Sequence, residues 1–402
     1  MRMFVLTGLK PSYSNPIGGI FITRRLQVLR KHGIYFTASD IRTYYGFIRK
    51  WAAIALKKIF GKTTATRDKK LASSRFLAEE VAYDGIAIPS GLPEWLYETY
   101  VVIKIAKILK NGRYDLVHAH CTYPEGYLAV KAASKRKIPV VITSHGGDIQ
   151  VLAKRSSSIQ VKLVETLNRA NRAIFVSQIL LDDARKLGYS ANNSIVIPNG
   201  YSANIFSPKN NREMRYRHGI ALKKKVIGFV GGLVADKRAD CFFDLFSMIK
   251  KIEPEAYFIV IGDGPFAGKL RDAKEHLSVH MTGFLSQNEV AGWMATFDVL
   301  ILPSRVEGWG CVIKEAQAMG VPCVGSDSGG IPEAIGSGGV IVKDSGEDFI
   351  EDFARAVVRV LKDPLDPKDV IKSAQGFTWE ETVGKEVAVY TEVISEYNWS
   401  KM

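Results

Sequence analysis

The chain has 402 residues, of which 47% are hydrophobic and 24% charged, so it exceeds one ordinary core and is not a disordered protein. No apolar run approaches the roughly 18 residues that span a bilayer, and the apolar burst 4–6 is too short for a signal peptide. Four cysteines without metal-ligand spacing predict reduced thiols and a cytoplasmic protein.

The net charge of +14 is distributed unevenly along the chain. Residues 1–205 hold 31 Lys and Arg against 13 Asp and Glu, a net charge of +18. The remainder holds 24 (55 − 31) against 28 (41 − 13), a net charge of −4. The basic first half predicts an anionic partner there, either a membrane surface or a charged ligand.

Ten short apolar runs alternate with helical stretches, which predicts an α/β protein with doubly wound parallel sheets. The runs cover residues 3–8, 115–120, 139–146, 173–178, 194–200, 225–233, 256–264, 299–304, 321–327 and 338–342. Two sets of strands with a break near 198–208 predict two Rossmann-like domains in tandem. We expect an N-terminal domain over 1–205 and a C-terminal domain over 206–380, with residues 381–402 packing back on the first.

Residues 44–60 read as a basic amphipathic helix, with Arg49, Lys50, Lys57 and Lys58 on one half-face. Such a helix can lie in a membrane interface, or it can pack on the first sheet with a solvated basic face. The lysine-rich loop that follows favours the membrane, because polybasic clusters contribute about 1 kcal/mol per charge near anionic lipid. The sequence therefore predicts contact with an anionic membrane surface through residues 44–75. No RNA- or DNA-binding module accompanies the charge, so no nucleic acid partner is expected.

Two glycine-containing turns follow predicted strands. Gly18 and Gly19 precede a helix, where glycine lets backbone amides approach an anion at the helix N-terminus. Lys237 and Arg238 end a second such turn, at the strand edge where doubly wound sheets bind ligands, and two cations there suit a pyrophosphate. Taken alone, the first is equally a tight turn, and the second is more simply a surface loop.

A histidine also falls at a strand end. His145 follows the predicted strand at 139–146 and could donate to a sugar hydroxyl or a phosphate, with Asp148 three residues later. The alternative is a strand-end side chain bonded to backbone. By contrast, we expect His118 and His120 to be structural.

The stretch EGWGCVIKE, residues 307–315, places two glutamates around a glycine-bracketed tryptophan. It follows a buried strand and continues into a helix, so Glu307 lies in a turn and Glu315 within the helix. Gly308 and Gly310 expose amides at the helix start, where the dipole favours anions. Glu315 can accept from both hydroxyls of a ribose and Glu307 from those of a hexose. This placement suggests that the pair binds a ligand and does not act as an acid/base pair.

Together these stretches resemble the family-4 glycosyltransferases, which have the GT-B fold of two Rossmann-like domains facing across a cleft. The resemblance covers nearly the whole chain and follows the family's order. It is carried by GGIF, HAH, TSHGGD, VSQ, IPNGY, VGGLVADK, IGDGP, TGFL, LPSRVEGWG, EAQAMGVPCVGSDSGGIPE and GGV. The NPIGGIF form and the early basic segment are most similar to members of the teichuronic-acid and exopolysaccharide type.

The resemblance implies a catalytic set of Glu307, Lys237 and His145. Glu315 would bind the donor ribose, Glu307 the sugar hydroxyls and Lys237 the pyrophosphate. The other contacts would come from the backbone of Gly19, Trp309, Gly310 and Leu285, the last at the base, and from His145 beside the transferring sugar. One position departs from the family, because Gly232 stands where an arginine often shares the pyrophosphate. Arg238 is the candidate replacement.

The resemblance thus implies a retaining hexosyltransferase that moves a sugar from a nucleotide-diphosphate donor to a glycan or polyprenyl-linked acceptor, in cell-surface polysaccharide or glycoconjugate synthesis. No cofactor and no metal are expected, because no two aspartates lie two apart and Lys237 with Arg238 could take the metal's electrostatic role. The enzyme would be cytoplasmic, peripheral on the inner face of the membrane. Alternatives are a nucleotide-sugar epimerase on the same fold and a non-catalytic nucleotide-sugar-binding protein.

Overall fold

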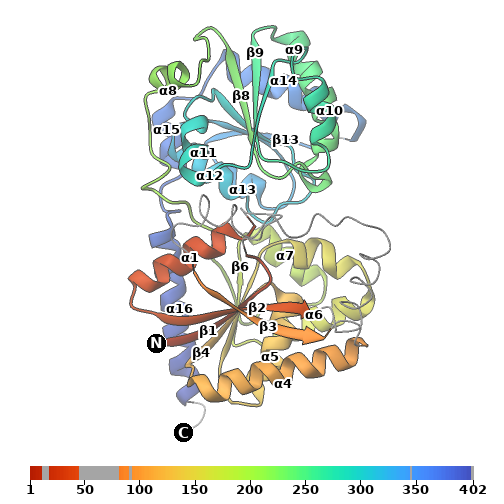
Figure 1. Cartoon of the computed structure of the whole chain (residues 1–402), viewed down its shortest axis with the longest axis vertical. Helices are drawn as coiled ribbons and strands as arrows, with labels where there is room; N and C mark the ends of the chain where they lie inside the picture. Colours follow the sequence, from red (N-terminus) through yellow and green to blue (C-terminus); the bar gives the residue numbers. More distant parts are fainter. Residues whose placement is uncertain (11–17, 45–80, 90–92, 345, 400–402) are drawn as a thin grey trace, which may run out of the picture. The chain divides into compact units, whose positions relative to one another are not determined.

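The computed structural model describes residues 1–10, 18–44, 81–89, 93–344 and 346–399. The chain forms two compact units (Figure 1). Unit 1 comprises Met1–Phe175, Asp183–Ile195 and Lys385–Met402, and unit 2 comprises Val176–Asp182 and Val196–Gly384. Of the predicted helix at 44–60, Tyr44 ends strand β2 (Tyr35–Tyr44), and the remainder, like the basic segment 45–75, lies outside the described residues.

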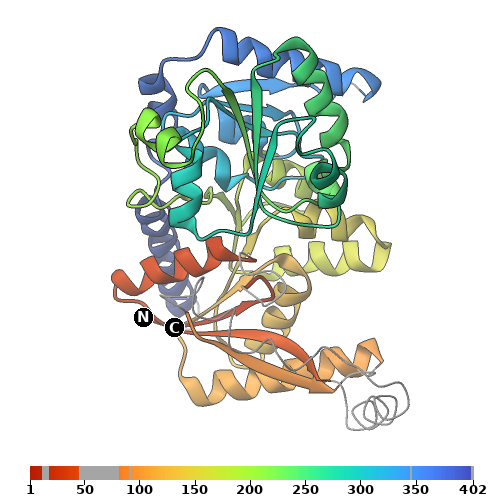
Figure 2. The same cartoon turned by 45° about the horizontal axis from the view of Figure 1, so that its top comes forward.

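Unit 1 contains a sheet with the strand order β3-β2-β1-β4-β5-β6-β7. Its strands are β1 (Arg2–Thr7), β2 (Tyr35–Tyr44), β3 (Tyr83–Pro89), β4 (Leu116–His120), β5 (Val140–Ser144), β6 (Arg172–Phe175) and β7 (Ser194–Val196). Its helices are α1 (Ile20–Lys31), α4 (Glu94–Gly112), η1 (Thr122–Gly126), α5 (Tyr127–Ser134), η2 (Gly147–Val151), η3 (Leu152–Lys154), α6 (Ser157–Arg169) and α7 (Gln178–Lys186), the last beginning in unit 2. Helices α1 and α4 lie on opposite faces of this sheet, and α4 runs below β2 and β3 in both views (Figures 1 and 2).

Unit 2 contains a sheet with the order β10-β9-β8-β11-β12-β13. Its strands are β8 (Lys225–Val230), β9 (Ala256–Ile261), β10 (Val279–Gly283), β11 (Val299–Leu302), β12 (Cys323–Ser326) and β13 (Gly339–Val342). Its helices are α8 (Asn211–Arg217), η4 (Ala235–Lys237), η5 (Ala239–Cys241), α9 (Phe242–Ile252), α10 (Ala267–Asp272), α11 (Gln287–Met294), α12 (Cys311–Ala318), α13 (Ile331–Ile335), η6 (Gly346–Asp348), α14 (Phe349–Lys362), α15 (Pro367–Ser373) and the start of α16 (Trp379–Trp399).

Neighbouring strands run parallel in both sheets, from β1 to β6 in unit 1 and from β8 to β13 in unit 2, wherever the described residues pair. Central strands are buried on both faces, as parallel strands under helices must be; every residue of β4, β5 and β11 is buried. The doubly wound α/β prediction is therefore confirmed, and each of the ten predicted runs overlaps one of these strands.

The strand orders define where a ligand site is expected. In each sheet the order of successive strands reverses at its first strand, so that β1 lies beside β4 in unit 1 and β8 beside β11 in unit 2. In doubly wound sheets, ligands bind outside the carboxyl ends of the strands at this switch point. The loops after these four strands are therefore the first places to look for chemistry.

Candidate functional site

The switch point of unit 2 brings together two residues that lie 70 positions apart. Lys237 ends the loop after β8, and Glu307 lies in the loop after β11. Their side chains form an ion pair in which the lysine side chain is 25% exposed and the glutamate side chain 15%. Because both ends are partly withdrawn from water, the pair is a compact charged centre that a ligand can reach and rearrange.

Arg238, the neighbour of Lys237, is held away from this pair. Its guanidinium forms a two-pronged ion pair with Asp344 and lies 3.8 Å from the ring centre of Phe349. The residue is buried and has the left-handed backbone angle φ 57°. These contacts commit Arg238 to the β13 side of the unit, so a donor pyrophosphate would have to displace Asp344 to use it. The structure thus gives Arg238 a packing role and does not favour it as the replacement for an arginine at 232.

Gly232 itself has room for a side chain. A Cβ placed there would meet only the methyl groups of Val234, at 3.9 and 4.0 Å, and the backbone is outside the left-handed region. We predict that Gly232→Arg tightens binding of UDP or GDP about tenfold, because a hydrogen bond to a charged group contributes ~1.5 kcal/mol. Titration calorimetry measures the effect, with Gly232→Met as the uncharged control. Equal affinities in the two variants would contradict the prediction.

Arg305 joins the two loops of the site, and sequence reasoning did not single it out. Its guanidinium donates to both carboxylate oxygens of Asp240, at 2.6 and 2.9 Å, and to the carbonyl of Ala235 at 2.9 Å. Its backbone N–H donates to the carbonyl of Asp236 at 2.8 Å. The loop that carries Glu307 is therefore bonded to residues that lie both before and after Lys237 in the sequence.

We predict that Arg305→Ala lowers turnover about 10- to 100-fold while the protein remains folded, because small displacements of positioned groups cost rates of this size. The arginine is partly exposed, so its ion pair contributes little to stability. Steady-state kinetics on the variant measures the loss of turnover, and circular dichroism shows whether the variant is folded. Arg355→Ala, which removes an exposed i,i+4 pair with Glu351 on α14, is the matched control. Unchanged turnover in Arg305→Ala would remove this arginine from the site.

The turn between β11 and α12 is built on backbone contacts. Gly310 caps α12 with φ 81°, and a Cβ there would lie 3.0 Å from Ile313 and 3.1 Å from Leu302, so only glycine fits without strain. The carbonyl of Gly308 accepts from the Ser177 hydroxyl at 2.8 Å, and that of Glu307 from the amide of Gly330 at 3.0 Å. The turn is thereby fixed at the start of an eight-residue helix.

The remaining predicted donor residues lie around this turn. Trp309 is buried, its ring centre is 5.6 Å from that of Phe377, and its indole nitrogen has no hydrogen-bond partner among the described residues. Glu315 lies within α12 and is half-buried. Leu285 follows β10 and is also half-buried. Sequence reasoning therefore located the turn and the helix correctly; the ligand contacts of these residues stay predictions.

A buried lysine anchors the helix that carries Glu315. The Lys314 ammonium donates to Gln317 at 3.0 Å and to the carbonyl of Ser373 at 2.7 Å, and it lies 4.4 Å from the ring centre of Phe377. Burial lowers the pKa of Lys314 to about 8. Its position one residue before Glu315 ties α12 to α15 and so fixes the direction in which Glu315 leaves the helix.

In unit 1, the first turn of α1, which follows Gly19, contacts His145 through Phe21. Gly19 is the N-cap of α1, with φ 60°, and a Cβ there would collide with the backbone of Leu9 and Lys10. Phe21, two residues on, packs its ring 4.9 Å from the ring centre of His145, which follows β5. The imidazole of His145 is hydrogen-bonded to His120, and burial lowers the pKa of His145 well below its usual value.

Two carboxyl groups support this edge of unit 1, and sequence reasoning gave neither a role. Asp148 accepts from the amides of Thr122 at 2.6 Å and Gly146 at 3.2 Å, which fixes the turn next to His145. Glu125 is buried beneath the loop after β1 and accepts from the backbone of Gly8; burial raises the pKa of Glu125 to about 7. These carboxyl groups hold the turn beside His145 and the first residue after β1.

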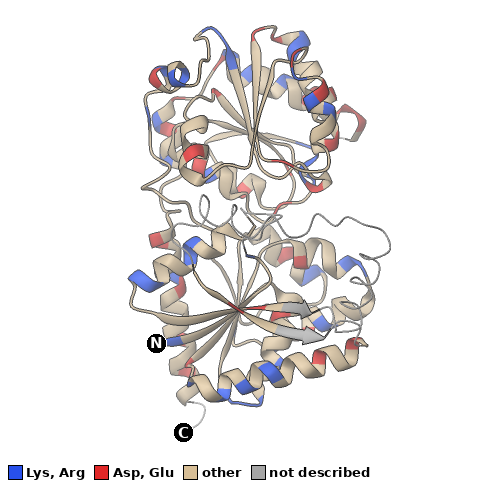
Figure 3. Ribbon diagram, in the orientation of Figure 1, with Lys and Arg blue, Asp and Glu red and all other residues tan. Residues whose placement is uncertain are grey.

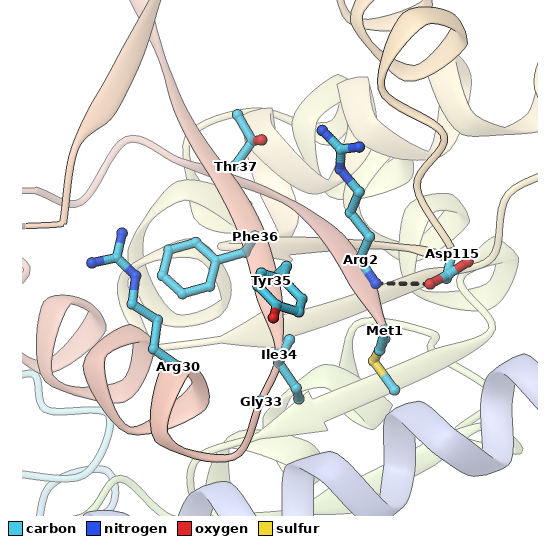
Figure 4. A pocket seen from close by; sticks show the side chains of 9 residues that line it. All are labelled: Met1, Arg2, Arg30, Gly33, Ile34, Tyr35, Phe36, Thr37 and Asp115. Carbon is cyan, nitrogen blue, oxygen red and sulfur yellow. Dashed lines mark hydrogen bonds between the residues drawn. The ribbon is translucent and has the colours of Figure 1, made fainter.

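The hollow drawn in Figure 4 lies at the other end of the unit 1 strands. It is lined by Met1, Arg2, Arg30, Gly33, Ile34, Tyr35, Phe36, Thr37 and Asp115, and the backbone amide of Arg2 donates to Asp115. These residues stand at the amino ends of β1, β2 and β4, away from the switch point. By the rule for doubly wound sheets, the hollow is not where a donor nucleotide is expected.

Two properties of the described part of the chain bear on metals and membranes. No three His, Cys, Asp or Glu side chains cluster there as ligands for a metal ion. None of its helices combines the length and the apolar character needed to cross a bilayer.

Comparison with known proteins defines the class. Residues 63–204 match the domain model described as Glycosyltransferase Family 4, and residues 224–363 match the model described as Glycosyl transferases group 1. The structure of Anabaena HepE in complex with UDP superposes with a TM-score of 0.70 at 17% identity, covering 98% of this chain and all of that one. The fold is thus that of the GT-B glycosyltransferases.

Curated glycosyltransferases match most of the chain in sequence. TuaC of Bacillus subtilis, named for teichuronic acid biosynthesis, is 27% identical over 84% of this chain and 83% of its own. An Escherichia coli galactosyltransferase, named for transfer from UDP-Gal to GlcNAc-diphosphoundecaprenol, is 26% identical over 66% of this chain and 70% of its own. The chain belongs to the family-4 glycosyltransferases and is a glycosyltransferase. None of these matches supports the epimerase or the non-catalytic binding protein.

Proposed function

We propose that this enzyme transfers a sugar, with retention of anomeric configuration and without a metal ion, from a nucleotide-diphosphate donor to a glycan or polyprenyl-linked acceptor. The observation that carries the proposal is the Lys237–Glu307 pair at the switch point of unit 2, beside the N-terminus of α12. The names of TuaC and of the galactosyltransferase support cell-surface polysaccharide or glycoconjugate synthesis as the setting.

In this proposal the donor separates the Lys237–Glu307 pair. The lysine turns to the diphosphate, whose negative charge grows as the sugar–phosphate bond breaks, and the carboxylate accepts from sugar hydroxyls. Backbone amides of Trp309 and Gly310, at the start of α12, also contact the sugar. Glu315 binds the ribose hydroxyls and Leu285 contacts the base.

Retention follows if the acceptor hydroxyl attacks from the face that the diphosphate leaves. The departing diphosphate oxygen then takes the acceptor proton, so the protein supplies no nucleophile. Fixed positive charge stabilises the leaving group in the role that a divalent cation has elsewhere. Gly19 and His145 of unit 1 contribute an amide to the diphosphate and an imidazole to the transferring sugar.

The test of the function is an incubation of the enzyme with a panel of UDP- and GDP-linked sugars, with and without a polyprenyl-diphosphate sugar acceptor. We expect nucleoside diphosphate and a lengthened acceptor only when both substrates are present, with the donor's anomeric configuration kept and the rate unchanged by EDTA. An epimerised donor formed without acceptor would contradict the proposal. A product of inverted configuration would contradict the retaining mechanism, and a loss of rate in EDTA would contradict its independence of metal ions.

We propose in addition that unit 1 contacts an anionic membrane surface through residues 44–75. Its supports are the basic composition of that segment and the exposed lysines of α4, a helix that carries several blue segments in Figure 3. Sedimentation with vesicles of phosphatidylglycerol, compared with vesicles of phosphatidylcholine, tests this for the full chain and for a variant with Lys57, Lys58, Lys69 and Lys70 changed to glutamine. Equal recovery of both proteins with both vesicles would refute the membrane contact.

A further inference from the structure

A chain of buried polar side chains runs through unit 1 behind His145. His145 Nε2 lies 3.1 Å from His120 Nδ1, and the guanidinium of Arg25 approaches the same nitrogen at 3.4 Å. Arg25 comes from α1, is completely buried and forms an ion pair of 3.0 Å with Glu386 of α16, which is equally buried. Three elements that are far apart in sequence thus meet behind the residue that the proposed function places beside the transferring sugar.

Arg25 decides which nitrogen of His120 carries its proton. A guanidinium has only N–H donors and keeps its charge, so the nitrogen facing it must offer a lone pair. A proton on His120 Nδ1 would set two donors against each other in a buried site, which is costly. His120 therefore has a bare Nδ1 and carries its proton on Nε2. That nitrogen has no partner among the described residues, so this tautomer leaves one donor unpaired but avoids two donors that face each other.

The state of His120 then determines the state of His145. If His120 Nδ1 is an acceptor, the hydrogen bond between the rings requires a proton on His145 Nε2. Burial and the charge of Arg25 both lower the pKa of His145 well below its usual value, so the ring is neutral at pH 7. The remaining nitrogen, His145 Nδ1, is then bare; it is buried and has no partner among the described residues.

His118, whose ring is tilted by 43° to that of His120 with centres 4.2 Å apart, belongs to a second branch that meets this chain at Glu386. Tyr390 donates to Glu386 at 3.2 Å, so its oxygen accepts from His118 Nδ1 at 3.0 Å. The other nitrogen of His118 accepts from Thr143 at 2.8 Å. His118 is fully occupied by these two bonds and does not compete for His145.

We infer that Arg25 and His120 are positioning residues for His145: they hold it in the tautomer with a proton on Nε2 and a bare Nδ1. Only the consequence for the ligand, that His145 meets a sugar hydroxyl, rests on the proposed function. A bare nitrogen can accept and cannot donate, so the ligand group that meets His145 Nδ1 is a sugar hydroxyl and not a phosphate oxygen. The sequence leaves a sugar hydroxyl and a phosphate open as partners of His145. The tautomer selects the hydroxyl, because only the hydroxyl can donate a proton to Nδ1.

The test is ¹⁵N–¹H correlation of histidine ring nitrogens in the full chain at pH 7, without ligand. The chain has 7 histidines, and His145→Gln assigns the signals of interest. We expect His145 to show a protonated Nε2 and an unprotonated Nδ1, in one tautomer only. In Arg25→Met/Glu386→Met, which removes both buried charges together, we expect the second tautomer to appear.

Tyr390→Phe is the matched control, because it removes a buried hydroxyl from the His118 branch and leaves Arg25, His120 and His145 in place. The His145 tautomer should be unchanged in this variant. A protonated Nδ1 on His145 in the wild type, or an unchanged tautomer in the Arg25→Met/Glu386→Met variant, would overturn the inference. Because the readout needs no donor or acceptor, it stands or falls separately from the transfer assay that tests the proposed function.

Discussion

Replacing Lys237 with alanine is expected to lower turnover about 100- to 1000-fold, the loss that follows removal of one group aimed at charge developing in a transition state. The ammonium faces Glu307 in the resting structure and is the cation that the proposed mechanism gives to the leaving diphosphate. Donor binding should largely persist, because the ribose and base contacts remain. Steady-state kinetics with calorimetric donor titration separates the two quantities.

Two further variants of this pair sharpen the result. Lys237→Arg keeps a positive charge and should recover part of the turnover lost in Lys237→Ala. Lys223→Ala removes an exposed lysine that pairs with Glu255 at 3.7 Å, and it should behave like the wild type. Wild-type turnover in Lys237→Ala would mean that leaving-group stabilisation comes from elsewhere in the protein.

Replacing Arg25 with methionine is expected to lower the free energy of unfolding of unit 1 by about 3–5 kcal/mol, the cost of leaving one member of a buried ion pair alone. Glu386 is completely buried on α16, so its carboxylate would lose its counter-charge without gaining water. The double variant Arg25→Met/Glu386→Met should recover most of the loss, because an apolar pair of similar volume replaces two buried charges. Hydrogen exchange of β1 and β4 amides reports on unit 1 specifically.

The comparison for this prediction is an exposed pair on the same unit. Arg169→Met removes an i,i+4 pair with Glu165 in which both side chains are about half exposed, and such pairs contribute about 0–1 kcal/mol. If Arg25→Met were no more destabilising than Arg169→Met, α16 would not be held on unit 1 by the buried pair. A double variant as unstable as the single one would point to lost packing in place of lost charge balance.

The central strands could be predicted because a parallel strand covered on both faces must be apolar at nearly every position. The three strands of the described chain that were missed are less apolar. β3 and β10 lie at sheet edges, and four of the five residues of β10 are partly exposed. β2, next to the edge, reads YFTASDIRTY and mixes polar with aromatic residues. An edge strand needs only one covered face, so a search for apolar runs overlooks it.

The site was predictable where it is local. The turn and helix at 307–315 and the glycine N-cap at Gly19 follow from residues that are neighbours in sequence. The pairing of Lys237 with Glu307 also follows, once both are assigned to strand ends at one switch point.

Contacts between loops could not be predicted. The bond from Arg305 to Asp240 spans 65 positions, and that from Arg238 to Asp344 spans 106. The local sequence does not distinguish an arginine that joins two loops from an arginine that faces a ligand. His120 is the instructive case: it is structural, as expected, and it also touches His145.

The most direct test of the whole account is calorimetric titration of UDP and GDP into the wild type, Glu315→Ala and Glu351→Ala. We expect one of the two nucleotides to bind the wild type and Glu351→Ala equally and to bind Glu315→Ala at least tenfold more weakly, because a ribose hydrogen-bonded to a charged carboxylate contributes ~1.5 kcal/mol or more. Binding to Glu315→Ala as tight as to the wild type would contradict it, because the nucleotide would then lie somewhere other than beside α12.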